Sequence, residues 1–140
     1  LPYQAHPYTA ALALSGVEVA DQLGLAREQV FKTLVTVGKS KKYYVFMIPV
    51  AEELNLKKAA TATQEKSIEM IKAKELLPLT GYVHGGCSPI GMKKAFPTYL
   101  DETARLYSTI FFSAGKIGLQ VEMPVAVLQQ ALPVQLTELT

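Results

Sequence analysis

The residues best suited to chemistry lie in a glycine-rich run from Gly81 to Lys94, with the sequence Gly-Tyr-Val-His-Gly-Gly-Cys-Ser-Pro-Ile-Gly-Met-Lys-Lys. The adjacent Gly85 and Gly86 lack a Cβ, so a ligand can approach the peptide N–H groups closely there. Successive N–H groups that point into one concavity bind anions, and two lysines close the run. An oxyanion, a ribose hydroxyl or a phosphate would suit such a loop. A tight turn with two solvated lysines is the alternative.

Several familiar signatures are absent from the sequence: the P-loop, the dinucleotide-binding glycine fingerprint and the G-x-S-x-G nucleophile elbow. The single cysteine, Cys87, follows His84 by three residues. A thiol nucleophile is therefore an alternative, although a small packing residue is the main interpretation. One cysteine and two histidines give no zinc constellation, so we predict no metal, no cofactor and no intramolecular disulfide.

Lys32 is the second candidate for chemistry. It stands between Phe31 and Leu34 in an apolar, β-branched run that predicts a strand. A charged group on a strand with one buried face either points to solvent or is held in a cleft. The burial preference of lysine favours solvent, which leaves a cleft as the alternative.

The elements that must position these residues are short. The patterns predict strands over 1–6, 30–37, 42–48, 97–100, 108–113, 118–122 and 134–139, a turn over 38–41, and helices over 17–23, 52–62, 72–77 and 125–132. The third helix is expected to end before Pro78. Strands outnumber helices and come partly in hairpins, so the predicted fold is α+β, with a mixed, curled sheet and helices packed outside it.

Size and composition favour one ordinary folded domain of 140 residues, 49% of them apolar, which would bury about two-thirds of its surface. No apolar run approaches the roughly 20 residues of a membrane helix and no signal peptide opens the chain, so we predict a cytoplasmic protein without membrane contact. The net charge of +2 is small. Three lysine clusters, 39–42, 57–58 and 93–94, are candidate phosphate contacts, with solvated lysines as the alternative.

Three separated segments resemble the YbaK/EbsC family of Cys-tRNA(Pro)/Cys-tRNA(Cys) deacylases, free-standing relatives of the editing domain inserted in bacterial prolyl-tRNA synthetases. They are residues 85–94, 30–34 and 113–119, and they lie in the family's order. The resemblance implies a barrel-like mixed sheet with peripheral helices, and aminoacyl-tRNA as partner, with prolyl-tRNA synthetase in a ternary complex. Family members carry a helix before the position of Leu1, so we expect a single editing domain, 1–140, that lacks this helix.

The resemblance also implies roles for individual residues. The family's activity depends most on the lysine at Lys32, whose ammonium would bind the terminal adenosine phosphate or the ester. Backbone N–H groups from Gly86 to Ser88 would hold the oxyanion or the ribose hydroxyl. Substrate-binding positions are implied at Tyr8, Phe31, Thr33, Gly85, Cys87, Pro89, Ser113, Gly115 and Gln120. Some relatives carry aspartate at the position of Gln120, which leaves amino-acid specificity open.

The reaction implied is hydrolysis of mischarged Cys-tRNA(Pro), or of Cys-tRNA(Cys), in which the cysteinyl thiol of the substrate attacks its own carbonyl and the protein supplies positioning and an oxyanion hole. Three alternatives remain. The chain could clear alanine from tRNA(Pro), as a close relative does. It could bind tRNA ends or a synthetase without turnover. It could also act as a thiol enzyme through Cys87.

Overall fold

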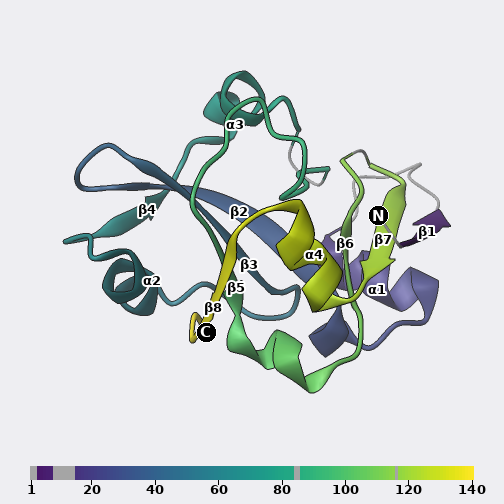
Figure 1. Cartoon of the computed structure of the whole chain (residues 1–140). Helices are drawn as coiled ribbons and strands as arrows, with labels where there is room; N and C mark the ends of the chain where they lie inside the picture. The colour runs from purple at the N-terminus through teal and green to yellow at the C-terminus, as the bar shows by residue number, and fades with distance from the viewer. Residues whose placement is uncertain (1–2, 8–14, 84–85, 116) are drawn as a thin grey trace.

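The structure is a computed structural model that describes residues 3–7, 15–83, 86–115 and 117–140. Two open sheets lie side by side, with helices around them (Figure 1). The smaller sheet has the order β1 (Gln4–Pro7), β7 (Leu119–Met123) and β6 (Ile110–Ser113). The larger has the order β4 (Ile68–Met70), β2 (Phe31–Gly38), β3 (Tyr43–Pro49), β5 (Thr98–Asp101) and β8 (Val134–Thr137).

The prediction of an α+β fold with a mixed sheet is confirmed, because β2 and β3 pair antiparallel while β5 pairs parallel with both β3 and β8. The expected curled, barrel-like closure is wrong. A barrel needs a continuous hydrogen-bonded ladder around its circumference. Between the two sheets, the described residues provide one isolated parallel bridge, from Val30 to Phe111.

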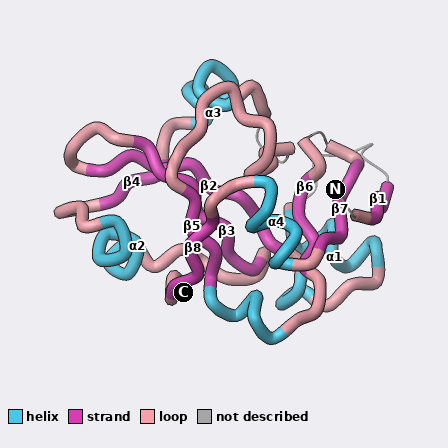
Figure 2. Tube along the Cα trace, viewed as in Figure 1, coloured by secondary structure: helices cyan, strands magenta, loops and turns pink. Residues whose placement is uncertain are grey.

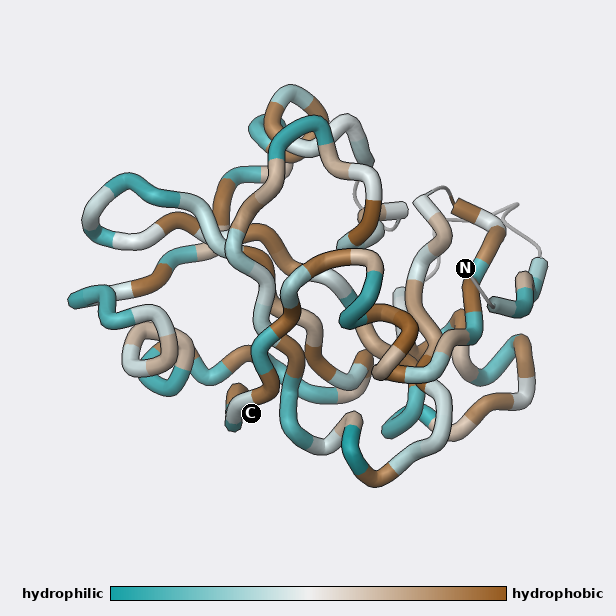
Figure 3. Tube along the Cα trace, viewed as in Figure 1, coloured by the Kyte–Doolittle hydropathy of each residue, from teal (hydrophilic) through white to brown (hydrophobic). Residues whose placement is uncertain are grey.

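The β2–β3 hairpin is the longest regular element and was predicted almost to its ends. Its tip closes where the Gly38 N–H donates to the Lys42 carbonyl at 2.8 Å and Lys41 takes a positive φ of 73°. The strands carry apolar residues on both faces because helices and loops cover them. Figure 3 shows brown, hydrophobic stretches in these strands and a teal, hydrophilic turn between them.

The main core lies between the two sheets and helix α4 (Val125–Ala131). It gathers buried side chains from both sheets and from this helix, among them Phe31, Met47, Leu100, Ile110, Phe112, Met123 and Leu128. A second cluster packs α2 (Leu56–Thr63) on the outer part of the larger sheet. The sheets are therefore joined by apolar packing far more than by backbone hydrogen bonds.

Two helices differ from the predicted ranges. Helix α2 begins later than expected, because the Asn55 side chain caps it by accepting hydrogen bonds from the N–H groups of Lys57 and Lys58. Helix α3 (Ala73–Thr80) continues through Pro78, so the expected end before this proline is wrong. It ends instead at Gly81, which has a φ of 84° and donates to the Leu77 carbonyl at 2.8 Å.

Three short elements were not predicted: strand β4 and the 3-10 helices η1 (Arg27–Gln29) and η2 (Glu102–Leu106). Helix α1 (Gly16–Leu23) lies close to its expected range and starts with a capping box between Ser15 and Glu18. None of the helices in the described part of the chain is long and apolar enough to cross a membrane.

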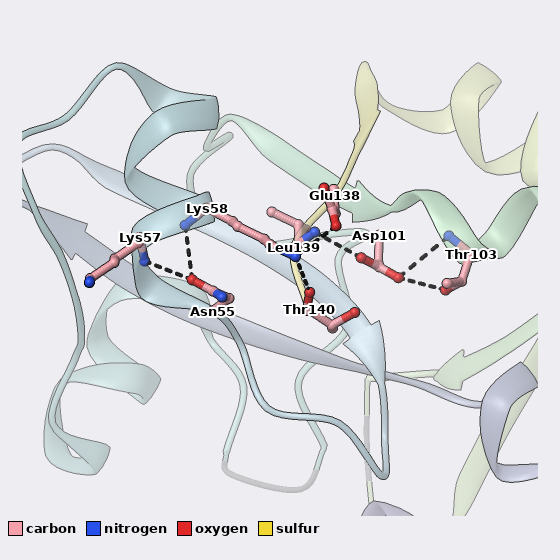
Figure 4. Close-up of polar contacts among 8 residues, drawn as sticks. All are labelled: Asn55, Lys57, Lys58, Asp101, Thr103, Glu138, Leu139 and Thr140. Carbon is pink, nitrogen blue, oxygen red and sulfur yellow. Dashed lines mark hydrogen bonds and ion pairs between the residues drawn. The ribbon is translucent and has the colours of Figure 1, made fainter.

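Polar contacts hold the residues that follow the last strand, β8, against the rest of the fold (Figure 4). The buried Asp101 carboxylate accepts the Leu139 N–H at 2.9 Å and, on its other oxygen, the Thr103 hydroxyl at 2.6 Å. Lys58 donates to Glu138 at 2.7 Å and to the Thr140 carbonyl at 2.6 Å. Asp101 therefore couples the start of η2 to the segment that follows β8.

Candidate active site

A cavity of about 300 Å³ opens between the start of β2 and the smaller sheet. Six of the residues singled out from the sequence line it: Phe31, Lys32, Thr33, Cys87, Ser113 and Gln120. They come from β2, from the loop after α3, from β6 and from β7, so the fold assembles three separated sequence segments in one place. The cleft alternative for Lys32 is the one that the structure supports.

The other predicted site residues are placed differently. Gly86, Ser88 and Pro89 are buried in the loop on either side of Cys87 but do not line this cavity. Gly115 follows β6 and also lies outside the lining. Tyr8 and Gly85 fall outside the described residues.

Lys32 is half-buried, and desolvation lowers the pKa of its ammonium, while the nearby Glu53 and Glu52 carboxylates act in the opposite direction. Within the described residues it makes no ion pair within 4.0 Å. A partly desolvated ammonium with no bound partner is suited to an anionic or strongly polar ligand, because such a ligand replaces the water that it has lost.

Among the described residues, two buried polar atoms in the cavity have no hydrogen-bond partner: Thr33 Oγ1 and Gln120 Oε1. Gln120 is only 6% exposed, and it pairs in register with Ser113 on β6. Buried polar groups are nearly always hydrogen-bonded, and leaving one unpaired costs about 1–3 kcal/mol. The two unpaired atoms, Thr33 Oγ1 and Gln120 Oε1, therefore mark a polar part of the cavity that is suited to a ligand's donors or to water.

The loop after α3 reaches the cavity at Cys87 (Figure 2 shows the long segment between α3 and β5 as loop). The Gly86 N–H already donates to the Val83 carbonyl at 3.0 Å. The N–H groups of Cys87 and Ser88 have no acceptor among the described residues. These two amides, rather than that of Gly86, are the free donors in the part of the loop that the structure describes, and Cys87 is the one of the three residues that lines the cavity.

The Cys87 thiol is buried, and this desolvation raises its pKa to about 12. A reactive cysteine needs a lowered pKa and a positive neighbour to form the thiolate. The environment of Cys87 has the opposite effect, which favours the packing role over the nucleophile. No group of three or more His, Cys, Asp or Glu side chains that could hold a metal occurs in the described ranges.

Sequence reasoning missed the wall that α1 contributes through Ser15, Gly16 and Val19. Gly16 packs against Val50, since a Cβ at Gly16 would lie 2.6 Å from Val50 Cγ1. The Ser15-Gly16 pair was recognised only as a helix start. Its closeness to the cavity depends on tertiary packing, for which the sequence carries no local signal.

A larger depression of about 730 Å³ is lined by residues 89–92 and 94–99 and by the end of α4 with the residues that follow it. Of the predicted site residues, Pro89 alone contributes to it. Since the unpaired polar atoms and Lys32 gather in the smaller cavity, we take the smaller cavity as the candidate active site.

Comparison with known proteins shows the class of protein to which the chain belongs. The model of the aminoacyl-tRNA editing domain family matches residues 12–131, and the chain belongs to this family. A protein of Enterococcus faecalis, named "Putative Cys-tRNA(Pro)/Cys-tRNA(Cys) deacylase EbsC", is 53% identical over 116 residues, which are 82% of this chain and 71% of the relative.

Solved structures agree with this assignment. One described as "a putative trans-editing enzyme for prolyl tRNA synthetase" has a TM-score of 0.87 at 25% identity, over 99% of this chain and 86% of the other. Another, described as a hypothetical protein, has a TM-score of 0.89 at 19% identity, over 99% of this chain and 91% of the other, and shows the shared fold alone.

Proposed function

We propose that the chain is a trans-acting editing enzyme that hydrolyses the ester of mischarged Cys-tRNA(Pro), with Cys-tRNA(Cys) as a second substrate. Its membership of the editing-domain family and the 53% identical relative named as a deacylase support this assignment. The chain is an aminoacyl-tRNA deacylase, and the finer choice of substrate rests on the cavity. Prolyl-tRNA synthetase is the proposed partner, because a structural neighbour is described as acting for that synthetase.

The observation that carries the proposal is the composition of the cavity wall. Among the described residues that line it are one cation, Lys32, and no aspartate, glutamate or histidine, and the thiol of Cys87 is held protonated by burial. The described wall therefore offers no general base for activating water. A substrate that brings its own nucleophile fits such a site, and cysteine is the amino acid that does so.

In the proposed reaction, the sulfur of the bound cysteinyl group attacks its own carbonyl carbon. The bond from that carbon to the ribose oxygen breaks, and the thiol proton reaches the departing ribose hydroxyl through solvent. The product is a cyclic thioester, which water then opens to free cysteine. The protein's part is to hold the ester in the attacking geometry and to stabilise the developing oxyanion.

Each of these tasks has a candidate group. Lys32 anchors the ester or the terminal phosphate, and the N–H groups of Cys87 and Ser88 face the oxyanion. Thr33 and Gln120 receive the polar atoms of the amino acid. A cavity of about 300 Å³ lies at the lower limit of small-ligand sites, so it suits an aminoacyl ester with its ribose rather than a longer stretch of tRNA.

Single-turnover deacylation with three charged tRNA(Pro) species tests the proposal: cysteinyl, alanyl and 2-aminobutyryl, the last carrying a methyl group in place of the thiol. Cleavage of the cysteinyl ester alone is expected. Equal cleavage of the 2-aminobutyryl ester would refute substrate-assisted attack, and preferred cleavage of the alanyl ester would make the chain an alanine-clearing enzyme. Binding without cleavage of any ester would make it a tRNA-binding module.

Variants assign the roles. Lys32→Ala should abolish most activity, and Lys66→Ala is the matched control, since Lys66 is an exposed lysine outside the three lysine clusters and does not line the cavity. Cys87→Ala should retain cleavage. Loss of all activity in Cys87→Ala, with Lys32→Ala active, would favour the thiol enzyme instead.

A further inference from the structure

Tyr82 lies between two loops that border the candidate active site. Its hydroxyl donates to the Ile90 carbonyl at 2.5 Å. Its backbone N–H donates to the Thr80 hydroxyl at 3.0 Å, and that hydroxyl donates to the Leu76 carbonyl of α3 at 2.7 Å. The tyrosine is thus fixed to the end of a helix on one side and to the 86–90 loop on the other.

Two glycines leave room for the tyrosine side chain. A Cβ added at Gly91 would lie 2.9 Å from Tyr82 Oη, and one added at Gly115 would lie 3.0 Å from Cε1. Both glycines have positive φ, 74° and 103°, which side-chain-bearing residues rarely adopt. Gly91 belongs to the loop after α3, whereas Gly115 belongs to the β6–β7 connection. The ring therefore touches both loops where only glycine fits.

Each of these loops carries groups of the site. The first carries Cys87, which lines the cavity, and Ser88, and the proposed function assigns the N–H groups of both to the oxyanion. The second follows Ser113, which lines the cavity and whose hydroxyl accepts the Gly115 N–H at 3.3 Å. The spacing between the two loops helps to set where the amides stand relative to the opposite wall.

We infer that Tyr82 is a positioning residue, which braces the 86–90 loop against the 113–115 segment and so holds the oxyanion-binding amides in place. The inference rests on the proposed function for its catalytic consequence. The structural part of the inference, that Tyr82 holds the two loops together, depends only on the contacts of Tyr82. Tyr82 also packs beside a small apolar cluster of Val35, Val45, Leu76 and Cys87, so a general contribution to folding must be separated from positioning.

The test compares Tyr82→Phe, which removes one hydrogen bond and keeps the ring, with Tyr82→Leu, which removes both. Tyr44→Phe is the matched control: the Tyr44 hydroxyl donates to Glu65 at 2.6 Å, and Tyr44 does not line the cavity. Deacylation of cysteinyl-tRNA(Pro) and hydrogen exchange of the 86–92 amides are measured for all three variants, at a temperature where each is folded.

Tyr82→Phe should lower kcat about fivefold, in proportion to one hydrogen bond, with KM within about twofold. Tyr82→Leu should lower kcat further, and both should speed exchange in 86–92, while Tyr44→Phe changes neither. A raised KM with unchanged kcat, or unchanged exchange in both Tyr82 variants, would overturn the inference. If the wild-type chain cleaves no ester, the proposed function fails, and the exchange measurement alone then decides whether the brace exists.

Discussion

Thr33 Oγ1 and Gln120 Oε1 are contributed to one cavity by different sheets, and neither finds a hydrogen-bond partner in the part of the chain that the structure describes. A protein selected for stability alone would pair such atoms or replace them with apolar groups. An unpaired buried polar atom lowers stability unless water or a ligand pairs with it, so at these two atoms binding and stability make opposite demands. This trade-off separates residues that serve function from residues that serve packing, and it can be measured.

Thr33→Val should therefore lower activity without lowering stability. Valine keeps the shape and removes a hydroxyl that the fold leaves unpaired, so the free energy of unfolding should stay equal or rise by about 1 kcal/mol. Urea titration and deacylation assays on the same preparation check both parts. Thr36→Val is the control, because Thr36 donates to the Tyr44 carbonyl at 3.0 Å and its loss should destabilise the protein. A destabilised Thr33→Val would show that its hydroxyl has a structural partner.

Lys32→Met should remove a pH dependence of stability. The pKa of Lys32 is lowered in the folded state, so the unfolded chain binds more protons, and this group adds stability as the pH rises toward the ordinary value of 10.5. The wild type should thus gain stability relative to Lys32→Met between neutral pH and about pH 10. Urea midpoints of both proteins at the two pH values test this. If the stability difference between the wild type and Lys32→Met were the same at both pH values, the Lys32 charge would not be desolvated.

Gly16→Ala should destabilise the protein by about 1–3 kcal/mol, because the new Cβ would lie 2.6 Å from Val50 Cγ1. The double variant Gly16→Ala with Val50→Ala should recover part of this loss, since the second change removes Val50 Cγ1 and leaves only its Cβ, 2.9 Å away, in conflict. Thermal unfolding of the two single variants and the double variant gives the coupling between the sites. Additive effects would mean that α1 shifts away from Val50 at little cost.

Asp101→Ala should destabilise the fold by about 2–3 kcal/mol, because it leaves the N–H of the fully buried Leu139 without an acceptor. Glu138→Gln is the control, since Glu138 forms an exposed ion pair with Lys58, and it should cost less than about 1 kcal/mol. Chemical unfolding measures both. Activity per folded molecule should be unchanged, because neither residue lines the cavity.

Cys87 should react slowly with iodoacetamide in the folded protein at pH 8. Burial raises its pKa to about 12 from 9.0, so the thiolate fraction should be at least about 100-fold lower than in the unfolded chain. Alkylation rates in buffer and in urea, followed by mass spectrometry, give the ratio. Similar rates in both would mean that the thiol is accessible and reactive.

The sequence was sufficient for the parts of the site that carry local chemical signals. The glycine run, the lysine within an apolar strand and the family resemblance placed Lys32, Thr33, Cys87 and Ser113 among the candidates, and all of them line one cavity. The residues alone drew attention to Lys32 and to the glycine run, because a charge in an apolar run or paired glycines conflict with ordinary packing, whereas Thr33 and Ser113 were candidates only through the family resemblance. Local conflict of this kind is visible without coordinates.

The remaining features depend on long-range packing. The wall formed by Gly16 and the occupied N–H of Gly86 could not be predicted, since both depend on neighbours brought together by folding. Strand β4 was missed because its three residues gain their conformation from pairing with β2. Pro78 was read as a helix stop, although the last turn of α3 tolerates it and Gly81 ends the helix.

In the described ranges one backbone bridge, between Val30 and Phe111, joins the two sheets, and this affects how the molecule responds to a ligand. Lys32 and Thr33 belong to the larger sheet, while Ser113 and Gln120 belong to the smaller one. A substrate that contacts all four would act as a cross-link between two halves that share few hydrogen bonds of their own. Occupancy of the cavity should then raise the melting temperature of both sheets together, which links substrate capture to the cooperativity of folding.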